Sequence, residues 1–215
     1  MGRPRTAAFD LQRTIIRREA ACLFADRGFP GASMADIARS CGVSKPLLYH
    51  YYRDKCELLF DIADSYMERL LVIADGVQRE GLDRDAHLRT LIARFMAEYE
   101  HSQAQHRVLV QDVKFLGKVE RNHILSKERR VVEIFTALIA GLQPSLSRPA
   151  PPVPLAMILF GMINWTFTWL RPDGPLSYAD MAGIVADVFL HGVSGPPAAC
   201  GLRHNPDSGT RESTG

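Results

Sequence analysis

The sequence lacks the signatures of an enzyme or a metalloprotein. It has no Gly-x-Ser-x-Gly motif, no Cys/His/Asp arrangement for nucleophilic catalysis and no glycine-rich phosphate loop. Its four cysteines have no paired spacing, and no His and Cys stand at zinc-ligand spacing. We therefore expect no catalytic residues, no metal, no cofactor, and reduced thiols in a cytoplasmic protein. An enzyme acting on hydrophobic substrates is the alternative from another class. Asp112, Glu120 and Glu133 are expected to be solvated charges on helix faces.

Long hydrophobic runs are also scarce. The longest uncharged stretch, residues 149–170, is long enough in principle to span a bilayer. Four of its first six residues are prolines, and Gly161, Asn164, Thr166 and Thr168 interrupt the remainder. Only about sixteen residues remain for a helix, which is short for a bilayer span of about 20 residues. We predict a buried helix and no membrane partner, with a membrane-anchored helical protein as the alternative.

Positive charge is concentrated at one end of the chain, although the net charge is only +2. Residues 1–55 hold ten Lys and Arg against five Asp and Glu, whereas the remainder holds 16 against 19. A basic N-terminal segment on a slightly acidic remainder favours a polyanionic partner for that segment, such as nucleic acid.

Strand-like alternation is absent over the first 194 residues, and helix signals are dense instead. Gly28 is placed to end a helix, Ser33 with Asp36 forms a Ser-x-x-acid helix start, and Gly42 supplies a left-handed turn. Prolines predict a loop at 143–154, and Gly, Pro and Ser predict a disordered tail at 195–215. We predict helices at about 10–27, 33–41, 44–51, 54–80, 84–101, 104–116, 119–142, 154–170 and 177–192.

The stretch 33–52 is the part of the sequence that indicates a function most specifically. Its apolar positions suit two short helices packed at a steep angle, with Ala38 where they cross and Gly42 in the turn. In such a helix-turn-helix the second helix enters the major groove of DNA while the first lies across the backbone. Lys45 can bond a guanine edge or a phosphate, and Tyr49 and His50 can contact phosphate and sugar. The predicted DNA-binding residues are Ser33, Met34, Ser44, Lys45, Pro46, Leu47, Tyr49, His50, Tyr51 and Lys55.

Residues 20–59 follow the pattern A-x-x-L-F-A-x-x-G-F and then S-x-x-D-I-A-x-x-x-G-V-S-K-x-x-L-Y-H-Y-Y-x-x-K-x-x-L-L. This pattern resembles that of the TetR/AcrR family of transcriptional regulators, whose members bind operator DNA as dimers. Pro46 stands where glycine is commonest, and Cys56 stands where glutamate is common. Because proline is tolerated in a first helical turn, we expect an altered base preference and retained DNA binding.

The resemblance implies an all-α fold, with an N-terminal three-helix DNA-binding domain that contains the helix-turn-helix and a larger C-terminal helical domain for ligand binding and dimerisation. It further implies a repressor that a small hydrophobic effector releases from a double-stranded DNA operator. We divide the chain into a basic flexible arm at 1–8, the DNA-binding domain at 9–56, the effector and dimerisation domain at 57–194, and the tail at 195–215.

Residues 161–177 read G-x-x-N-W-T-x-x-W-x-R-P-x-G-x-L-S. This motif is similar to that of a subset of the family with acyl-CoA effectors, from fatty acid, steroid or phenylacetate catabolism. Its two tryptophans are four residues apart, so on one helix they would share a face and form an aromatic wall. The predicted effector-binding residues are Phe115, Phe160, Asn164, Trp165, Phe167, Thr168, Trp169 and Arg171. The cations available for CoA phosphates are Lys114, Lys118, Arg121, Lys127, Arg129, Arg130 and Arg171.

Two alternatives stay open for the C-terminal half. The tryptophans could instead pack in a homodimer interface, since the family pairs its last two helices across a two-fold axis and residues 154–192 are apolar enough to do so. The effector could instead be a lipophilic drug sensed by a regulator of efflux.

Overall fold

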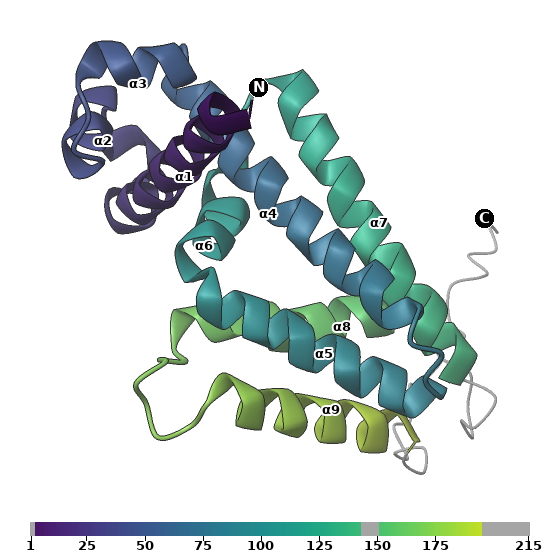
Figure 1. The fold of residues 1–215 in the computed structure, drawn as a ribbon. Coiled ribbons are helices and arrows are strands. Elements are labelled where there is room, and N and C mark those ends of the chain that lie inside the picture. The colour runs from purple at the N-terminus through teal and green to yellow at the C-terminus, as the bar shows by residue number, and fades with distance from the viewer. Residues whose placement is uncertain (1–2, 143–150, 195–215) are drawn as a thin grey trace, which may run out of the picture.

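The computed structural model describes residues 3–142 and 151–194, which form nine α-helices and two short 3₁₀ helices and contain no β-strand (Figure 1). The all-α prediction is confirmed. The α-helices are α1 (Arg3–Gly31), α2 (Met34–Ser40), α3 (Lys45–Tyr51), α4 (Lys55–Gln78), α5 (Arg84–His101), α6 (Gln103–Asp112), α7 (Lys118–Leu142), α8 (Pro152–Asn164) and α9 (Tyr178–Ser194). The 3₁₀ helices are η1 (Val113–Phe115) and η3 (Trp165–Thr168).

Helices α1 to α3 form one end of the molecule, here called the head (Figure 1). The backbone of α1 breaks at Gly28, whose φ is 72°, so the predicted helix end is confirmed there. Gly42 turns the chain between α2 and α3 with a φ of 64°, which is the predicted left-handed turn. Ala38 is 3% exposed where these two helices pack. The head therefore follows its local sequence signals closely.

The start of α1 differs from the prediction, because the helix already begins at Arg3. It takes in most of the stretch 1–8 that was expected to be a flexible arm, and residues 1–2 lie outside the described residues. Pro4 is compatible with a first helical turn. Further along, Phe9 stacks on Tyr51 of α3 with ring centroids 4.5 Å apart, which anchors this first part of α1 to α3.

Helix α4 leaves the head and runs into the remaining helices, α5 to α9, here called the body (Figure 1). It packs on α7 and α5, while α9 packs along α5 and α8 lies against α7. Ten apolar or aromatic residues of α4 are buried, in positions spaced as one wide face of a helix requires. Within the described part of the chain, no helix is long and apolar enough to cross a membrane.

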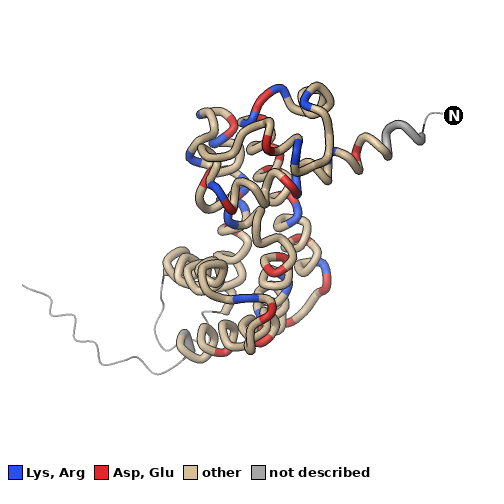
Figure 2. Tube along the Cα trace, turned by 90° about the vertical axis from the view of Figure 1, so that its left-hand side faces the viewer, with Lys and Arg blue, Asp and Glu red and all other residues tan. Residues whose placement is uncertain are grey.

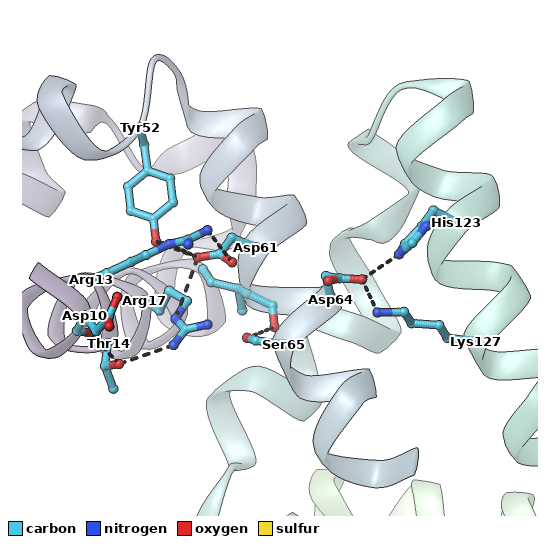
Figure 3. A network of polar contacts seen from close by, with 11 residues as sticks. Asp10, Arg13, Thr14, Arg17, Tyr52, Asp61, Asp64, Ser65, His123 and Lys127 are labelled. Carbon is cyan, nitrogen blue, oxygen red and sulfur yellow. Dashed lines mark hydrogen bonds and ion pairs between the residues drawn. The ribbon is translucent and has the colours of Figure 1, made fainter. Parts of the chain in front are cut away.

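Charged contacts join α4 to the head and to α7 (Figure 3). Asp61 of α4 pairs with Arg13 of α1 at 2.9 Å and accepts a hydrogen bond from the Tyr52 hydroxyl at 2.5 Å. One turn further along α4, the carboxylate of Asp64 pairs with Lys127 of α7 at 2.5 Å. The same helix is therefore held by the head on one side and by the body on the other, and a displacement of α4 would reach both.

Two predicted helices have different ends in the structure. The predicted helix at 104–116 is divided into α6 and η1. The predicted helix at 154–170 begins at Pro152, because its prolines fit a first turn, and ends at Asn164 before tightening into η3. The hydroxyls of Thr166 and Thr168 donate to backbone carbonyls three residues earlier, at 2.6 and 2.7 Å, which competes with α-helical hydrogen bonding. Residues 143–150 and the predicted disordered tail at 195–215 lie outside the described residues.

Candidate DNA interface and effector cavity

Helix α3 is anchored in the head by a single fully buried side chain. Leu48 is 0% exposed, whereas Lys45, Leu47, Tyr49 and His50 are exposed around it. Among the described residues, no acidic side chain pairs with Lys45. The helix thus offers a cation, a phenol and an imidazole on an outward surface, which are groups that bind base edges and phosphates.

Both helices of the helix-turn-helix begin with a side-chain cap. The Ser33 hydroxyl accepts from the backbone N–H of Asp36 at 3.2 Å, and the Asp36 carboxylate accepts from the Ser33 N–H at 3.3 Å. The Ser33 hydroxyl also donates to the Asp36 carboxylate at 2.5 Å, and this bond, followed by the one from Arg39, lowers the pKa of Asp36. Ser44 caps α3 by accepting from the N–H of Leu47 at 3.3 Å, and Pro46 lies in the first turn. The capping box predicted at Ser33 is confirmed.

Three of the predicted DNA-binding residues make contacts within the protein itself. Met34 is 9% exposed, so most of its side chain packs in the core of the head. Tyr51 is half-buried against Phe9. The Lys55 ammonium donates to the backbone carbonyls of Phe29 and Ala32, at 2.6 and 2.8 Å, which holds the end of α1 against the start of α4.

The body contains a cavity of about 930 Å³ between α4, α5, α6, η1, α7 and α8. Most of its walls are apolar, including Met67, Leu70, Phe95, Leu109 and Phe160. Its exposed lining residues mark the open side, and two of them, Lys114 and Arg121, are cations. A volume of this size with an apolar interior suits a small hydrophobic molecule.

The structure brings three of the eight predicted effector-binding residues to this cavity, namely Phe115, Phe160 and Asn164. The expected aromatic wall is wrong: because η3 is not α-helical, Trp165 and Trp169 do not share a helix face, and they are 66% and 50% exposed outside the cavity lining. Phe167, Thr168 and Arg171 also lie outside the lining. Of the seven candidate cations, only Lys114 and Arg121 line the cavity, and Lys127 is paired with Asp64 and Glu68.

Several cavity residues were not predicted from the sequence. His106, 2% exposed, and Asp112, 6% exposed, both lie on the buried face of α6, so the expectation that Asp112 is solvated is wrong. Tyr99 of α5 also lines the cavity and donates to the Asn164 side-chain oxygen at 2.8 Å. The spacing of His106, Leu109 and Asp112 could have indicated polar groups on an apolar helix face, because these positions share one side of a helix.

Burial changes the ionisation of the polar groups in the cavity. It raises the pKa of Asp112 and of Glu128, although the backbone N–H of Phe29 stabilises the Asp112 carboxylate in part. Burial lowers the pKa of His106 to about 4, and the nearby Asn164 backbone carbonyl opposes that shift. The imidazole is therefore neutral at pH 7.

One wall of the cavity reaches the head. Phe115 of η1 stacks on Phe29 with ring centroids 5.3 Å apart and planes inclined by 23°. The Lys55 ammonium lies 4.3 Å from the centroid of the Phe29 ring. Pro30, the next residue in the chain, itself lines the cavity. A ligand that moves η1 therefore acts on the end of α1 and the start of α4 at the same point.

Family models match both parts of the chain. The model described as "Bacterial regulatory proteins, tetR family" matches residues 16–62, which include the helix-turn-helix. The model described as "Tetracyclin repressor-like, C-terminal domain" matches residues 81–193, which is more than half of the chain.

Relatives with names and structures agree with these matches. The HTH-type transcriptional repressor KstR2 of Rhodococcus jostii is 27% identical over 191 residues, which cover 86% of this chain and 92% of that protein. A TetR-family transcriptional regulator from Bordetella parapertussis superposes with a TM-score of 0.78 at 30% identity, over 84% of this chain and 94% of the other. AibR, solved in complex with isovaleryl coenzyme A and operator DNA, superposes with a TM-score of 0.75 at 27% identity, over 83% of this chain and 98% of the other.

Proposed function

The chain belongs to the TetR family of DNA-binding transcriptional regulators, and from that premise we propose that it is a homodimeric repressor released from its operator by an acyl-CoA thioester. The observation that carries the effector part is the 930 Å³ cavity, which combines an apolar interior with Lys114 and Arg121 at its open side. An acyl chain would occupy the interior, and the two cations would meet the CoA phosphates.

The DNA-binding part of the proposal rests on the exposed side of α3. Lys45, Tyr49 and His50 would contact the major groove and its phosphates, and the capped N-terminus at Ser44 would meet base edges. In a dimer the two heads would read half-sites about one helical turn apart, or a little more. Lys55 is assigned instead to bracing the head, since backbone carbonyls occupy its ammonium.

The dimer is proposed to form through α8 and α9. Helix α8 carries no charged residue, and Val153, Met157 and Ile158 are each about half exposed on it. Ile184 and Val188 are exposed to a similar degree on α9. In Figure 2 the charged residues are interspersed over the upper part of the molecule and are sparse on the lower helices. An apolar surface of this kind is favourable when a second copy covers it.

Release would proceed through the contact between η1 and the head. Effector bound beside Phe115 would displace the Phe29–Phe115 stack. It would thereby also disturb the hydrogen bonds by which the Lys55 ammonium holds the start of α4 against the end of α1. The effector must bind the DNA-incompatible state more tightly than the DNA-bound state. A hundredfold loss of operator affinity requires a coupling free energy of about 2.7 kcal/mol.

A second candidate effector is a lipophilic cation, sensed by a regulator of efflux. Asp112 and Glu128 favour it, because both carboxyls line the cavity and a bound cation would stabilise their charged forms. The AibR complex supports the acyl-CoA, since that relative is similar over nearly its whole length.

Two measurements test the proposal. Fluorescence anisotropy at moderate salt should show tighter binding to DNA upstream of the gene than to a random duplex, and equal affinity would refute the repressor function. Thermal unfolding should show a higher melting temperature with octanoyl-CoA than with octanoate or rhodamine 6G. Stabilisation by rhodamine 6G alone would select the efflux alternative.

A further inference from the structure

The cavity contains two carboxyl groups for which an acyl-CoA supplies no positive charge. Asp112 lies on the buried face of α6, and Glu128 is half-buried on α7. Both residues belong to the cavity lining. Within the part of the chain that the structure describes, neither carboxyl forms an ion pair. Each is therefore an incompletely compensated charge in a mostly apolar enclosure.

The cations that act on these carboxyls are also the cations that the effector needs. The positive charge of Lys114 on η1 stabilises the Asp112 carboxylate, and that of Arg121 stabilises the Glu128 carboxylate. Lys114 and Arg121 both line the open side of the cavity, where they would meet the CoA phosphates. The two carboxylates and the effector phosphates therefore compete for the same two positive charges.

The other polar groups around the carboxyls are already bonded, lie outside the lining or are neutral. Lys55 of α4, which also acts on Asp112, donates to two backbone carbonyls, and Arg129, which acts on Glu128, lies outside the cavity lining. The backbone N–H of Phe29 on α1 donates to Asp112. Tyr99 of α5 and His106 of α6 are neutral at pH 7, because burial raises the pKa of the phenol and lowers the pKa of the imidazole to about 4. The lining residues of α8 carry no charge.

A bound acyl-CoA would disfavour the charged form of both carboxyls. Burial already raises the pKa of Asp112 and of Glu128. An acyl chain beside them would displace the water that solvates their charge, and phosphates bound to Lys114 and Arg121 would add negative charge nearby. Both effects raise the pKa of the carboxyls further. A lipophilic cation would lower it, because its charge stabilises a carboxylate.

We propose that binding of acyl-CoA is coupled to protonation, with Asp112 and Glu128 together taking up about one proton as the effector enters the cavity. The proton comes from the buffer, binds a carboxylate oxygen and returns to the buffer when the effector leaves. The inference rests on the proposed function, in which the cavity holds an acyl-CoA. Uptake of one proton makes effector binding roughly tenfold tighter for each unit by which the pH falls. Acidification would therefore release the operator at a lower effector concentration.

Isothermal titration calorimetry with octanoyl-CoA measures the proton exchange directly. At pH 7 the observed heat differs between HEPES and Tris, which have different ionisation enthalpies, in proportion to the number of protons exchanged. The unmodified protein should take up about one proton per bound molecule. The double variant Asp112→Asn/Glu128→Gln keeps the size and hydrogen-bonding oxygens of both side chains and should take up none. Glu133→Gln, an exposed position of α7 outside the lining, is the matched control and should keep the uptake.

The outcomes separate this inference from the proposed function. Octanoyl-CoA that binds the unmodified protein with no proton exchange or with proton release would overturn the inference and leave the proposed function in place. An uptake that persists in the double variant would overturn it too, because other groups would then take up the proton. If octanoyl-CoA does not bind to protein that still binds its operator, the acyl-CoA proposal itself fails.

A second readout does not depend on a variant that folds. In infrared difference spectra of the unmodified protein, octanoyl-CoA should add the C=O band of a protonated carboxyl group and remove carboxylate absorption. The carboxyl band shifts in heavy water, which distinguishes it from the thioester carbonyl. Bound octanoyl-CoA without this band would show that both carboxyls stay ionised and would overturn the inference.

Discussion

Helix α3 and the wall of the cavity place polar groups in opposite surroundings. On α3 the cation and hydrogen-bonding groups are exposed, and Leu48 alone is fully buried beneath them. In the cavity His106 and Asp112 are buried among apolar side chains. Exposed groups can be replaced with little change in stability, whereas buried ones alter folding and binding together. Variants of the two regions should therefore differ in their effect on stability.

The largest effect is expected from Leu48→Ala. Removing this fully buried side chain should lower the free energy of unfolding by about 3 kcal/mol, because a cavity is left under α3. The neighbouring Leu47→Ala is the control, since Leu47 is 41% exposed and should change stability by less than about 0.5 kcal/mol. Chemical denaturation measures both, and equal losses would show that α3 is not held by its buried side.

Acid should destabilise the protein through His106 by nearly as much. In the unfolded chain the pKa of histidine is about 6.5, whereas burial lowers the pKa of His106 to about 4. Between these values the unfolded state takes up a proton that the folded state excludes, so the free energy of unfolding falls as the pH falls, by up to about 3 kcal/mol. Denaturation from pH 7 to 4 should show this slope, and His106→Phe should lose that contribution. The same slope in the variant would contradict a neutral buried His106.

For Lys45→Ala the expected change is in DNA recognition, with a loss of about 1–3 kcal/mol in binding if Lys45 contacts a base edge. The preference among operator variants should relax at one position, while the melting temperature stays the same because the side chain is exposed. A uniform loss on every sequence would place Lys45 on a phosphate. Lys118→Ala removes an exposed lysine at the start of α7 and should leave operator binding unchanged.

The smallest effect is expected from Phe115→Ala, which removes the stack on Phe29. Such a pair contributes about 1 kcal/mol, so saturating octanoyl-CoA should weaken operator binding about 20-fold in the variant, in place of about 100-fold. Operator affinity without ligand should change little. Val119→Ala, at 78% exposure, is the control for the same surface. Unchanged release in Phe115→Ala would remove the stack from the coupling pathway.

Much of the head could be predicted from sequence because its signals are local. Gly28 and Gly42 adopt left-handed backbone angles, and Ser33 with Asp36 closes a capping box within four residues. The start of α1 was missed, since the anchor for its first part is Tyr51, some forty residues away.

The sequence by itself determined the all-α fold and the helix-turn-helix, because capping, turn glycines and helical periodicity act over a few residues. Only the tertiary structure decided which side chains line the cavity. His106, Tyr99 and Asn164 come from three helices, and their meeting point depends on how those helices pack. It also decided that Trp165 and Trp169 lie outside the cavity lining, because Thr166 and Leu170 are the residues of this segment that pack inward, at 1% and 7% exposure.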